Sequence, residues 1–286
     1  MKLHGAIAAA VTPLREGGRT LDLDAVGPLI AYWAAGGIDG VLVAGTTGEG
    51  VLLSPDERRH LTERFVADRP EGFQVAIHAG AQTMQDTVAL AAHALEHGAD
   101  AVAVIAPPYF PLDADELLVH LRSAANVCDP LPFYVYEFAG RSGYSIPVET
   151  IERLRHEAPN LAGLKVSDLP FEAVKPYLID GLDVFIGQEP LALEGFAAGA
   201  VGCVSGLASA WPDVVASLVH DRDPDAHARV IALRDALEGI PFLAALKHML
   251  SNRGVLTSTD VRPPLRGLTP DEIARVDARL YFFTRA

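Results

Sequence analysis

The stretch Asn160-Leu161-Ala162-Gly163-Leu164-Lys165 decides the fold, because similar short apolar runs precede it at a regular spacing. Such runs, when bounded by turn signals, are typical of buried strands. Counted back from Lys165, their ends fall at intervals of 29, 29, 29 and 31 residues, near Tyr136, Pro107, His78 and Thr47. One strand, one helix and their connections fill an interval of this length. The spacing therefore predicts strand–helix units arranged around a parallel sheet.

Eight strands of this kind are predicted along the chain. Their residues are 6–11, 40–44, 74–77, 101–105, 132–136, 161–165, 183–186 and 201–204. Apolar residues at helical spacing fill most of the gaps, and segments such as Ser54-Pro55-Asp56-Glu57 mark helix starts. Eight strands alternating with helices predict a closed (β/α)8 TIM barrel of the α/β class. A doubly wound open sheet is the alternative, but no Gly-x-Gly-x-x-Gly segment follows an early strand.

The chain beyond the eighth strand reads mostly as helices. Their predicted residues are 212–220, 225–238, 241–252 and 270 to the end. The sequence contains no evident linker, low-complexity stretch or block of like charge. We therefore expect a single domain, with the barrel over residues 1–210 and a C-terminal helical extension over 211–286.

Composition excludes several classes of protein. Of 286 residues, 50% are hydrophobic and 21% charged, so the chain can bury a large core. The net charge of −14 argues against binding nucleic acid or an anionic membrane. Cys128 and Cys203 do not make a disulfide framework and fit a reducing compartment. The N-terminus lacks a signal-peptide pattern, and no apolar run could cross a bilayer. We therefore expect a soluble cytoplasmic protein that binds small molecules.

Lys165 is a candidate for covalent chemistry, because it ends a predicted strand between apolar neighbours. A buried lysine is costly unless it is paired or reactive. Desolvation favours the neutral amine, which is the form that attacks a carbonyl. A lysine held in a salt bridge is the structural alternative. Tyr136 ends the preceding strand, so it should lie beside Lys165, where a phenol could exchange protons with a carbinolamine. A tyrosine that only fills the core is the alternative there.

Two loops near these strand ends carry groups suited to anions. Gly45-Thr46-Thr47-Gly48-Glu49 offers consecutive backbone amides between glycines, which can form an anion-binding nest. A plain glycine turn is the alternative. Arg141 lies in the loop after the fifth strand and is suited to a carboxylate, although a solvated arginine is the usual case. Because parallel barrels carry their active sites at the carboxyl ends of the strands, these groups should converge.

These residues make the chain resemble the dihydrodipicolinate synthase and N-acetylneuraminate lyase family of class I aldolases. The resemblance extends from Gly5 to about Thr269. The motifs that carry it are Val11-Thr12-Pro13, Gly45-Thr46-Thr47-Gly48-Glu49, Pro108-Tyr109, Tyr136, Gly163-Leu164-Lys165, Gly199-Ala200-Val201-Gly202-Cys203-Val204-Ser205, Lys247 and Arg262-Pro263-Pro264-Leu265.

The resemblance implies specific roles for these residues. Lys165 is implied to form the Schiff base, and Tyr136 and Thr47 to transfer protons. The amides of Thr46 and Thr47 are implied to bind the carboxylate of pyruvate. The other residues expected to bind substrate are Arg141, Gly187, Ser205 and Tyr109. No metal or organic cofactor is expected, since the protonated imine is itself the electron sink. A homotetramer built from tight dimers is usual in the family.

Three departures from the family pattern bear on the substrate. Phe110 stands where the synthases have a second tyrosine, which reaches across the dimer into the proton relay. Glu137-Phe138-Ala139 replaces the usual Asn-Val-Pro. His78-Ala79-Gly80 looks more like the sialic-acid lyases. However, Thr46-Thr47 looks more like the synthases, and so does Arg141, which in them holds the carboxylate of the second substrate. We therefore expect weak synthase activity.

The sequence thus predicts a lyase that forms a Schiff base with pyruvate or a 2-keto acid and makes or cleaves a C–C bond. The preferred substrate is a 2-keto-3-deoxy sugar acid or another 4-hydroxy-2-keto acid. One alternative is the condensation of pyruvate with aspartate semialdehyde, and another is dehydration of a keto-sugar acid through the same imine. A further alternative, pyruvate binding without turnover, rests on Phe110 and Glu137. The retained Lys165 and Tyr136 argue against it.

Overall fold

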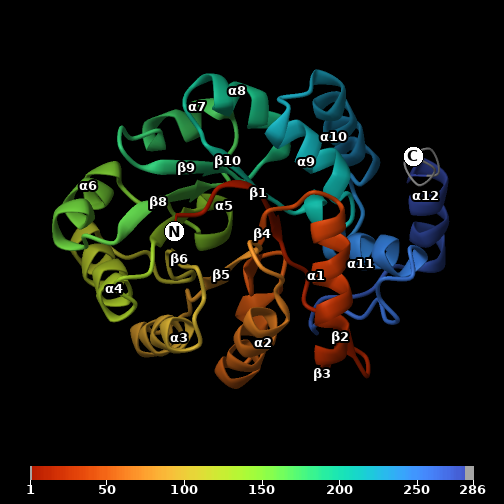
Figure 1. Ribbon diagram of the computed structural model, residues 1–286, viewed down its shortest axis with the longest axis horizontal. Coiled ribbons are helices and arrows are strands. Elements are labelled where there is room, and N and C mark those ends of the chain that lie inside the picture. Colours follow the sequence, from red (N-terminus) through yellow and green to blue (C-terminus); the bar gives the residue numbers. More distant parts are fainter. Residues whose placement is uncertain (1, 281–286) are drawn as a thin grey trace.

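The computed structural model describes residues 2–280. Its centre is a closed barrel of parallel strands in the order β1-β10-β9-β8-β7-β6-β5-β4, surrounded by helices (Figure 1). The strands are β1 (Gly5–Ala9), β4 (Gly40–Val43), β5 (Gln74–His78), β6 (Ala101–Ile105), β7 (Phe133–Glu137), β8 (Leu161–Val166), β9 (Asp183–Ile186) and β10 (Gly202–Ser205). Each strand lies beside the next one in sequence, and β1 closes the ring between β4 and β10. The predicted TIM barrel is confirmed.

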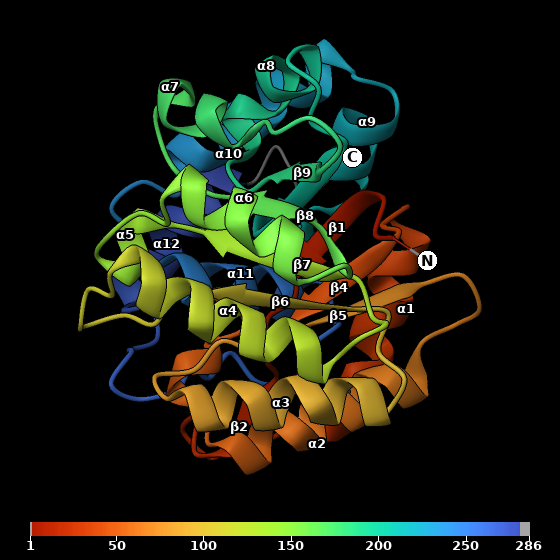
Figure 2. The same cartoon turned by 90° about the vertical axis from the view of Figure 1, so that its left-hand side faces the viewer.

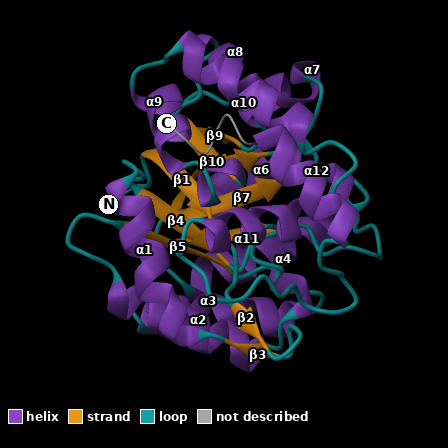
Figure 3. Ribbon diagram, turned by 90° about the vertical axis from the view of Figure 1, so that its right-hand side faces the viewer, coloured by secondary structure: helices purple, strands orange, loops and turns teal. Residues whose placement is uncertain are grey.

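One small sheet was not expected from the sequence. The strands β2 (Leu14–Arg15) and β3 (Thr20–Leu21) form an antiparallel hairpin at the periphery (Figure 3). Two residues per strand are too few to show an alternating pattern. Gly18 in the turn has a φ of +80°, and a Cβ there would lie 2.0 Å from the Val261 carbonyl oxygen. The hairpin therefore packs closely on the C-terminal segment.

Helices cover the outside of the barrel. They are α1 (Val26–Ala35), α2 (Pro55–Asp68), α3 (Met84–Glu96), α4 (Ala114–Val127), α6 (Val148–Glu157), α7 (Phe171–Val174), α8 (Ala192–Ala197) and α9 (Pro212–His220). Three of them, α2, α3 and α4, begin at a residue whose side chain caps the helix. Ser54 and Glu57 form a capping box at α2, as the sequence indicates, and Asp113 and Glu116 form another at α4. The short helix α5 (Ala139–Ser142) lies where a loop was expected.

A helical extension follows the barrel. It contains α10 (Pro224–Ala236), α11 (Phe242–Asn252) and α12 (Pro270–Leu280). Residues 281–286, the end of the last expected helix, lie outside the described part of the chain. Figure 2 shows the barrel strands running between the helices α3 and α4 on one side and α8, α9 and α10 on the other. No helix in residues 2–280 is long and apolar enough to span a membrane.

The barrel interior is filled by side chains toward its amino end. Tyr134 and Phe185 meet there edge to face, with their ring centroids 5.8 Å apart. The Tyr134 hydroxyl accepts a hydrogen bond from the backbone N–H of Leu3 at 3.0 Å. Small residues such as Ala76 and Ala103 complete the packing. Because this end is filled, the carboxyl ends of the strands form the end at which a site can be built.

Candidate active site

Lys165 stands at the carboxyl end of β8, opposite Tyr136 on the neighbouring strand β7. Its Nζ lies 4.0 Å from the centroid of the Tyr136 ring. Both residues are buried, at 6% and 1% exposed respectively. Among residues 2–280, no carboxylate is within ion-pair distance of Lys165, so the salt-bridged alternative is not observed. The structure therefore brings a desolvated amine and a phenol together, as their strand positions predict.

Thr46 provides the hydroxyl that contacts Tyr136. The phenol oxygen lies 3.0 Å from Thr46 Oγ1, and either group can donate. This differs from the expected pairing of Tyr136 with Thr47. The Thr47 hydroxyl instead lies next to Gly206, 3.4 Å from where a Cβ on that glycine would be. Consecutive side chains in a turn point in different directions, and the sequence alone does not fix which one faces Tyr136.

The turn that carries the two threonines is compact. The backbone N–H of Glu49 donates to Thr46 O, and that of Gly50 donates to Gly45 O, both at 3.1 Å. A Cβ on Gly50 would lie 1.8 Å from the Ala44 carbonyl oxygen, so only glycine fits there. Within the described chain, no protein acceptor is hydrogen-bonded to the amides of Thr46 and Thr47. Two adjacent donors are thus available in a turn of the kind that binds anions.

His78 supports the Tyr136 ring from the end of β5. The two rings meet nearly perpendicularly, with centroids 5.8 Å apart. His78 Nδ1 lies 3.1 Å from the carbonyl oxygen of Ala44, which can only accept, so Nδ1 carries the proton. Burial and, to a smaller extent, the nearby positive charge of Arg58 together lower the pKa of His78 to about 3. His78 is therefore a neutral imidazole at neutral pH.

Glu137, the residue after Tyr136, is a buried carboxyl with an unusual environment. It is 0% exposed, and its Oε2 accepts the backbone N–H of Ile146 at 2.9 Å. Its Oε1 finds no donor among the described residues. Burial and, to a smaller extent, the negative charge of the neighbouring Asp168 together raise the pKa of Glu137 to about 8. A protonated Glu137 can donate a hydrogen bond to Asp168, which would satisfy the unpartnered oxygen.

Arg141 lies on α5, the short helix that begins two residues after Glu137. The helix is held at its start, where the N–H of Ala139 donates to Asp168 Oδ1 at 2.9 Å. The Arg141 guanidinium lies 5.7 Å from the centroid of the Phe138 ring. Its side chain is exposed, and within the described chain it forms no ion pair. Arg141 is therefore available to an anionic ligand.

The remaining predicted binding residues differ in what they can offer. Gly187 follows β9 and packs so closely that a Cβ would lie 1.9 Å from Ser167 Oγ. Ser205 ends β10, but its buried hydroxyl donates to Glu189 Oε1 at 2.5 Å. This side chain therefore orders Glu189, which leaves only the Ser205 backbone for a ligand. Tyr109 is 82% exposed, with a φ of +83°.

Sequence reasoning did not single out Glu189. Its carboxylate is 0% exposed and forms an ion pair with Arg234 of α10. Its Oε1 also accepts the backbone N–H of Leu207 at 3.0 Å. The ion pair and the hydrogen bonds together hold the pKa of Glu189 below its ordinary value, against the desolvation that would raise it. Because Arg234 lies 45 residues away in sequence, no local pattern reveals this pair.

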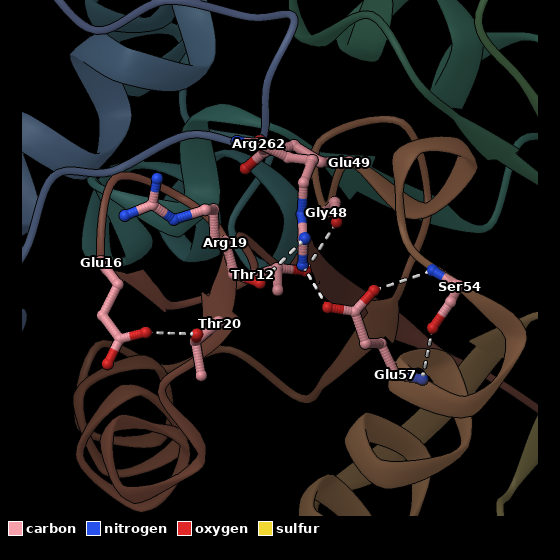
Figure 4. A network of polar contacts seen from close by, with 9 residues as sticks. All are labelled: Thr12, Glu16, Arg19, Thr20, Gly48, Glu49, Ser54, Glu57 and Arg262. Atoms are coloured by element: carbon pink, nitrogen blue, oxygen red, sulfur yellow. Dashed lines mark hydrogen bonds and ion pairs between the residues drawn. The ribbon is translucent and has the colours of Figure 1, made fainter.

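Lys247, the other buried lysine, is fully paired. Its Nζ lies 2.6 Å from Glu49 Oε1, and both side chains are 0% exposed. It also donates to the carbonyl oxygen of Asp260 at 2.6 Å. On its other side, the Glu49 carboxylate accepts the backbone N–H of Arg262, whose guanidinium extends to Glu57 (Figure 4). Lys247 thus anchors the C-terminal segment to the threonine turn.

A cavity of about 480 Å³ opens at the carboxyl ends of β7, β8 and β9. This volume is in the range of small-molecule sites. Its lining includes the polar residues Ser145, Ser167, Asp168 and Gln188. Gln188 is fixed by a hydrogen bond from its Nε2 to Ser167 O at 2.9 Å. The cavity therefore borders the strand ends that carry Lys165 and Tyr136 and presents hydrogen-bonding groups.

Comparison with known proteins agrees with this geometry. The sequence profile of the Dihydrodipicolinate synthetase family matches residues 2–281. The chain belongs to this family. It is 33% identical over 283 residues to 4-hydroxy-tetrahydrodipicolinate synthase of Nitrobacter hamburgensis, covering 94% of this chain and 93% of that one. It is 34% identical over 234 residues to N-acetylneuraminate lyase of Rhizobium meliloti, covering 80% and 75%.

The fold agrees equally well with a solved member of the dihydrodipicolinate synthetase family. Proteus mirabilis N-acetylneuraminate lyase superposes with a TM-score of 0.90 at 29% identity, covering 99% of both chains. The protein is accordingly a class I aldolase-type lyase, an enzyme that makes or breaks C–C bonds. The family and the enzyme class predicted from sequence are thus confirmed. The two names found among its relatives denote different substrates.

Proposed function

We propose that Lys165 forms a Schiff base with the C2 carbonyl of pyruvate or a 2-keto acid. The observation that carries this proposal is the contrast among the four lysines of the chain. Lys2 pairs with Asp183 at 3.0 Å, Lys175 with Glu172 at 3.5 Å and Lys247 with Glu49 at 2.6 Å. Lys165 is buried and, within the described chain, unpaired.

The neighbouring groups support the proton transfers of this chemistry. Attack of Lys165 Nζ on C2 gives a carbinolamine, whose hydroxyl must leave as water. The Tyr136 phenol, hydrogen-bonded to Thr46 at 3.0 Å, is placed to supply that proton and to recover one later. The substrate carboxylate is assigned to the amides of Thr46 and Thr47. The protonated imine then accepts the electron pair released when the C3–C4 bond breaks.

We further propose that the preferred substrate is a 2-keto-3-deoxy sugar acid or another 4-hydroxy-2-keto acid. The cavity of about 480 Å³ at the ends of β7, β8 and β9 supports this, because polar groups in its lining, including Ser167 and Asp168 just after the lysine, can bind a hydroxylated chain. Asp168 and Gln188 can each hydrogen-bond to hydroxyl groups. Arg141 is assigned to an acidic or polyhydroxy end of the substrate.

Condensation of pyruvate with aspartate semialdehyde is the second candidate. The full-length relatives named as synthases and the retained Arg141 favour it. Phe110 argues for weak activity, because it has no hydroxyl to take part in proton transfer. Its neighbour Tyr109 is 82% exposed on the protomer surface.

Two assays separate the candidates. Pyruvate release from a panel of 4-hydroxy-2-keto acids should exceed condensation with aspartate semialdehyde, when both are compared as kcat/KM. The Phe110→Tyr variant should raise the condensation rate and leave cleavage unchanged. A wild-type condensation efficiency at or above roughly 10⁴ M⁻¹s⁻¹, unimproved by the tyrosine, would assign the protein to the synthases.

We also propose that the protein is a homotetramer built from tight dimers. Among the exposed large apolar side chains, Met84, Phe110 and Val119 line one surface hollow, at 48%, 65% and 43% exposed. Tyr109, 82% exposed, packs edge to face against Phe110. An exposed apolar cluster favours a protein interface. The mass in solution should be four times the 30.4 kDa of one chain. A monomer at micromolar concentration would exclude this assembly.

A further inference from the structure

Two histidines and a glutamate gather on the outer surface of the barrel, on helices that lie side by side (Figures 1 and 2). His93 lies in the last turn of α3, and His97 caps its end. Glu63 faces them from α2. The Nε2 atom of His93 is 3.1 Å from Glu63 Oε1, and that of His97 is 4.0 Å from the same oxygen. The three ligand atoms lie within 4.8 Å of one another.

The position of the cluster separates it from the catalytic chemistry. His97 lies four residues before β6 begins at Ala101, so it is at the amino end of the barrel strands. Lys165 is near the carboxyl end of β8. The cluster is therefore not part of the site for the keto acid.

The ligands in this cluster are of the kind preferred by divalent cations that are intermediate between hard and soft. Imidazole nitrogens and a carboxylate oxygen are ligands for Zn²⁺, Co²⁺ and Ni²⁺. Histidines four residues apart on a helix present their rings on one face, as in known helical zinc sites. Here the two ring centroids are 4.1 Å apart.

We propose that Glu63, His93 and His97 form a binding site for Zn²⁺ or a similar divalent cation, which ties α2 to α3. Ligand atoms around tetrahedral zinc lie about 3.3 Å apart, given bonds of about 2.0–2.1 Å. The observed spacing approaches this, and the side chains of Glu63 and His97, 43% and 37% exposed, are free to adjust. The fourth position is open to water.

The electrostatic surroundings permit a cation. The chain has a net charge of −14. The guanidinium of Arg59, which is four residues before Glu63 on α2, is paired with Asp56 at 2.6 Å. Other histidine–carboxylate pairs, such as His220 with Asp39 at 2.7 Å, lack a third ligand within the described chain. His220 is therefore a matched control.

The site is tested by calorimetric titration of Zn²⁺ into the full-length protein, freed of metal and without a histidine tag. The proteins are wild type, Glu63→Gln, His97→Asn and the control His220→Asn. Wild type and control should bind one Zn²⁺ per chain with equal affinity. Each site variant should bind roughly tenfold more weakly or worse. Zn²⁺ should also raise the melting temperature of wild type and control by several degrees, and that of the site variants little.

Spectra of the Co²⁺-loaded protein provide a second readout. Wild type should show the intense visible absorption of four-coordinate cobalt, and Glu63→Gln and His97→Asn should not. Circular dichroism in the absence of metal verifies that the variants are folded. Equal affinity in all four proteins, or binding to wild type only at millimolar Zn²⁺, would overturn the proposal. Neither result would bear on the Schiff base at Lys165.

Discussion

The hydroxyl of Tyr136 is the proton-transfer group that a single substitution tests best. Tyr136→Phe keeps the ring beside Lys165 and removes only the oxygen that lies 3.0 Å from Thr46 Oγ1. We expect turnover to fall roughly a hundredfold or more, the range for a lost acid–base group. Stability should change little. Unchanged steady-state kinetics would remove this tyrosine from the mechanism.

The two threonines provide a matched comparison for the same pathway. Thr46→Val removes the hydroxyl that contacts Tyr136, whereas Thr47→Val removes one that lies beside Gly206. Both variants keep their backbone amides. We therefore expect the larger loss of kcat in Thr46→Val. A larger loss in Thr47→Val would restore the pairing expected from the sequence.

Glu137 should make stability depend on pH. Its pKa is about 8 in the folded protein, against an ordinary value of 4.5. Between these values the folded chain binds more protons than the unfolded chain. The free energy of unfolding therefore falls as the pH rises through this window, and the loss is complete above it. One pKa unit corresponds to about 1.4 kcal/mol, so the loss is on the order of a few kcal/mol.

Urea unfolding at several pH values checks this expectation. Glu137→Gln keeps a hydrogen-bond donor toward Asp168 and cannot ionise, so its stability should fall less than that of wild type between pH values of about 5 and 8.5. Glu149→Gln, at an exposed position in the first turn of α6, is the control and should follow wild type. Parallel curves for all three proteins would show that Glu137 ionises normally.

At the scale of the element, α5 positions a cation at the mouth of the barrel. Arg141→Ala should lower kcat/KM by about tenfold to a hundredfold through a raised KM, because a hydrogen bond to a charged group is worth about 1.5–3 kcal/mol. Trapping of pyruvate on Lys165 should survive. Arg153→Ala, which breaks an exposed pair with Asp115, is the control. Loss of trapping in Arg141→Ala would place the pyruvate carboxylate at this arginine.

The buried ion pair between Lys247 and Glu49 connects the helix α11 to the threonine turn. Lys247→Met would leave Glu49 buried without its cation. Removing one partner of a buried ion pair costs about 3–5 kcal/mol. The double variant with Glu49→Gln should recover part of this loss. Lys175→Met breaks an exposed pair, 54% and 71% exposed, and should cost less than about 1 kcal/mol. Equal losses in chemical denaturation would contradict the structural role of Lys247.

At the scale of the whole molecule, the barrel could be predicted because its strands are continuous buried runs at a regular spacing. The neighbouring placement of Tyr136 and Lys165 followed from that spacing alone. The hairpin of β2 and β3 and the helix α5 were not predicted, since two to four residues carry too little periodic signal.

The contacts that complete the site could not be predicted from local sequence patterns, because they join residues that are far apart in the chain. Lys247 and Glu49 are 198 residues apart, and Thr46 and Tyr136 are 90 apart. Which of two adjacent threonines faces the phenol depends on backbone torsions in one turn. The hydrogen bond between the Ser205 hydroxyl and Glu189 likewise depends on how the helical turn after β9 packs against the end of β10. Such details are set by tertiary packing, which the sequence pattern does not encode locally.

Borohydride reduction in the presence of a 2-keto acid tests the central claim most directly. Reduction of the imine formed with pyruvate fixes a three-carbon adduct on the reacting lysine, and peptide mass spectrometry locates it. Only four lysines are available in the chain. We predict modification of Lys165 alone, with none in Lys165→Ala and full modification of Lys165 in the control Lys175→Ala. An adduct on Lys247, or turnover that persists in Lys165→Ala, would contradict the account.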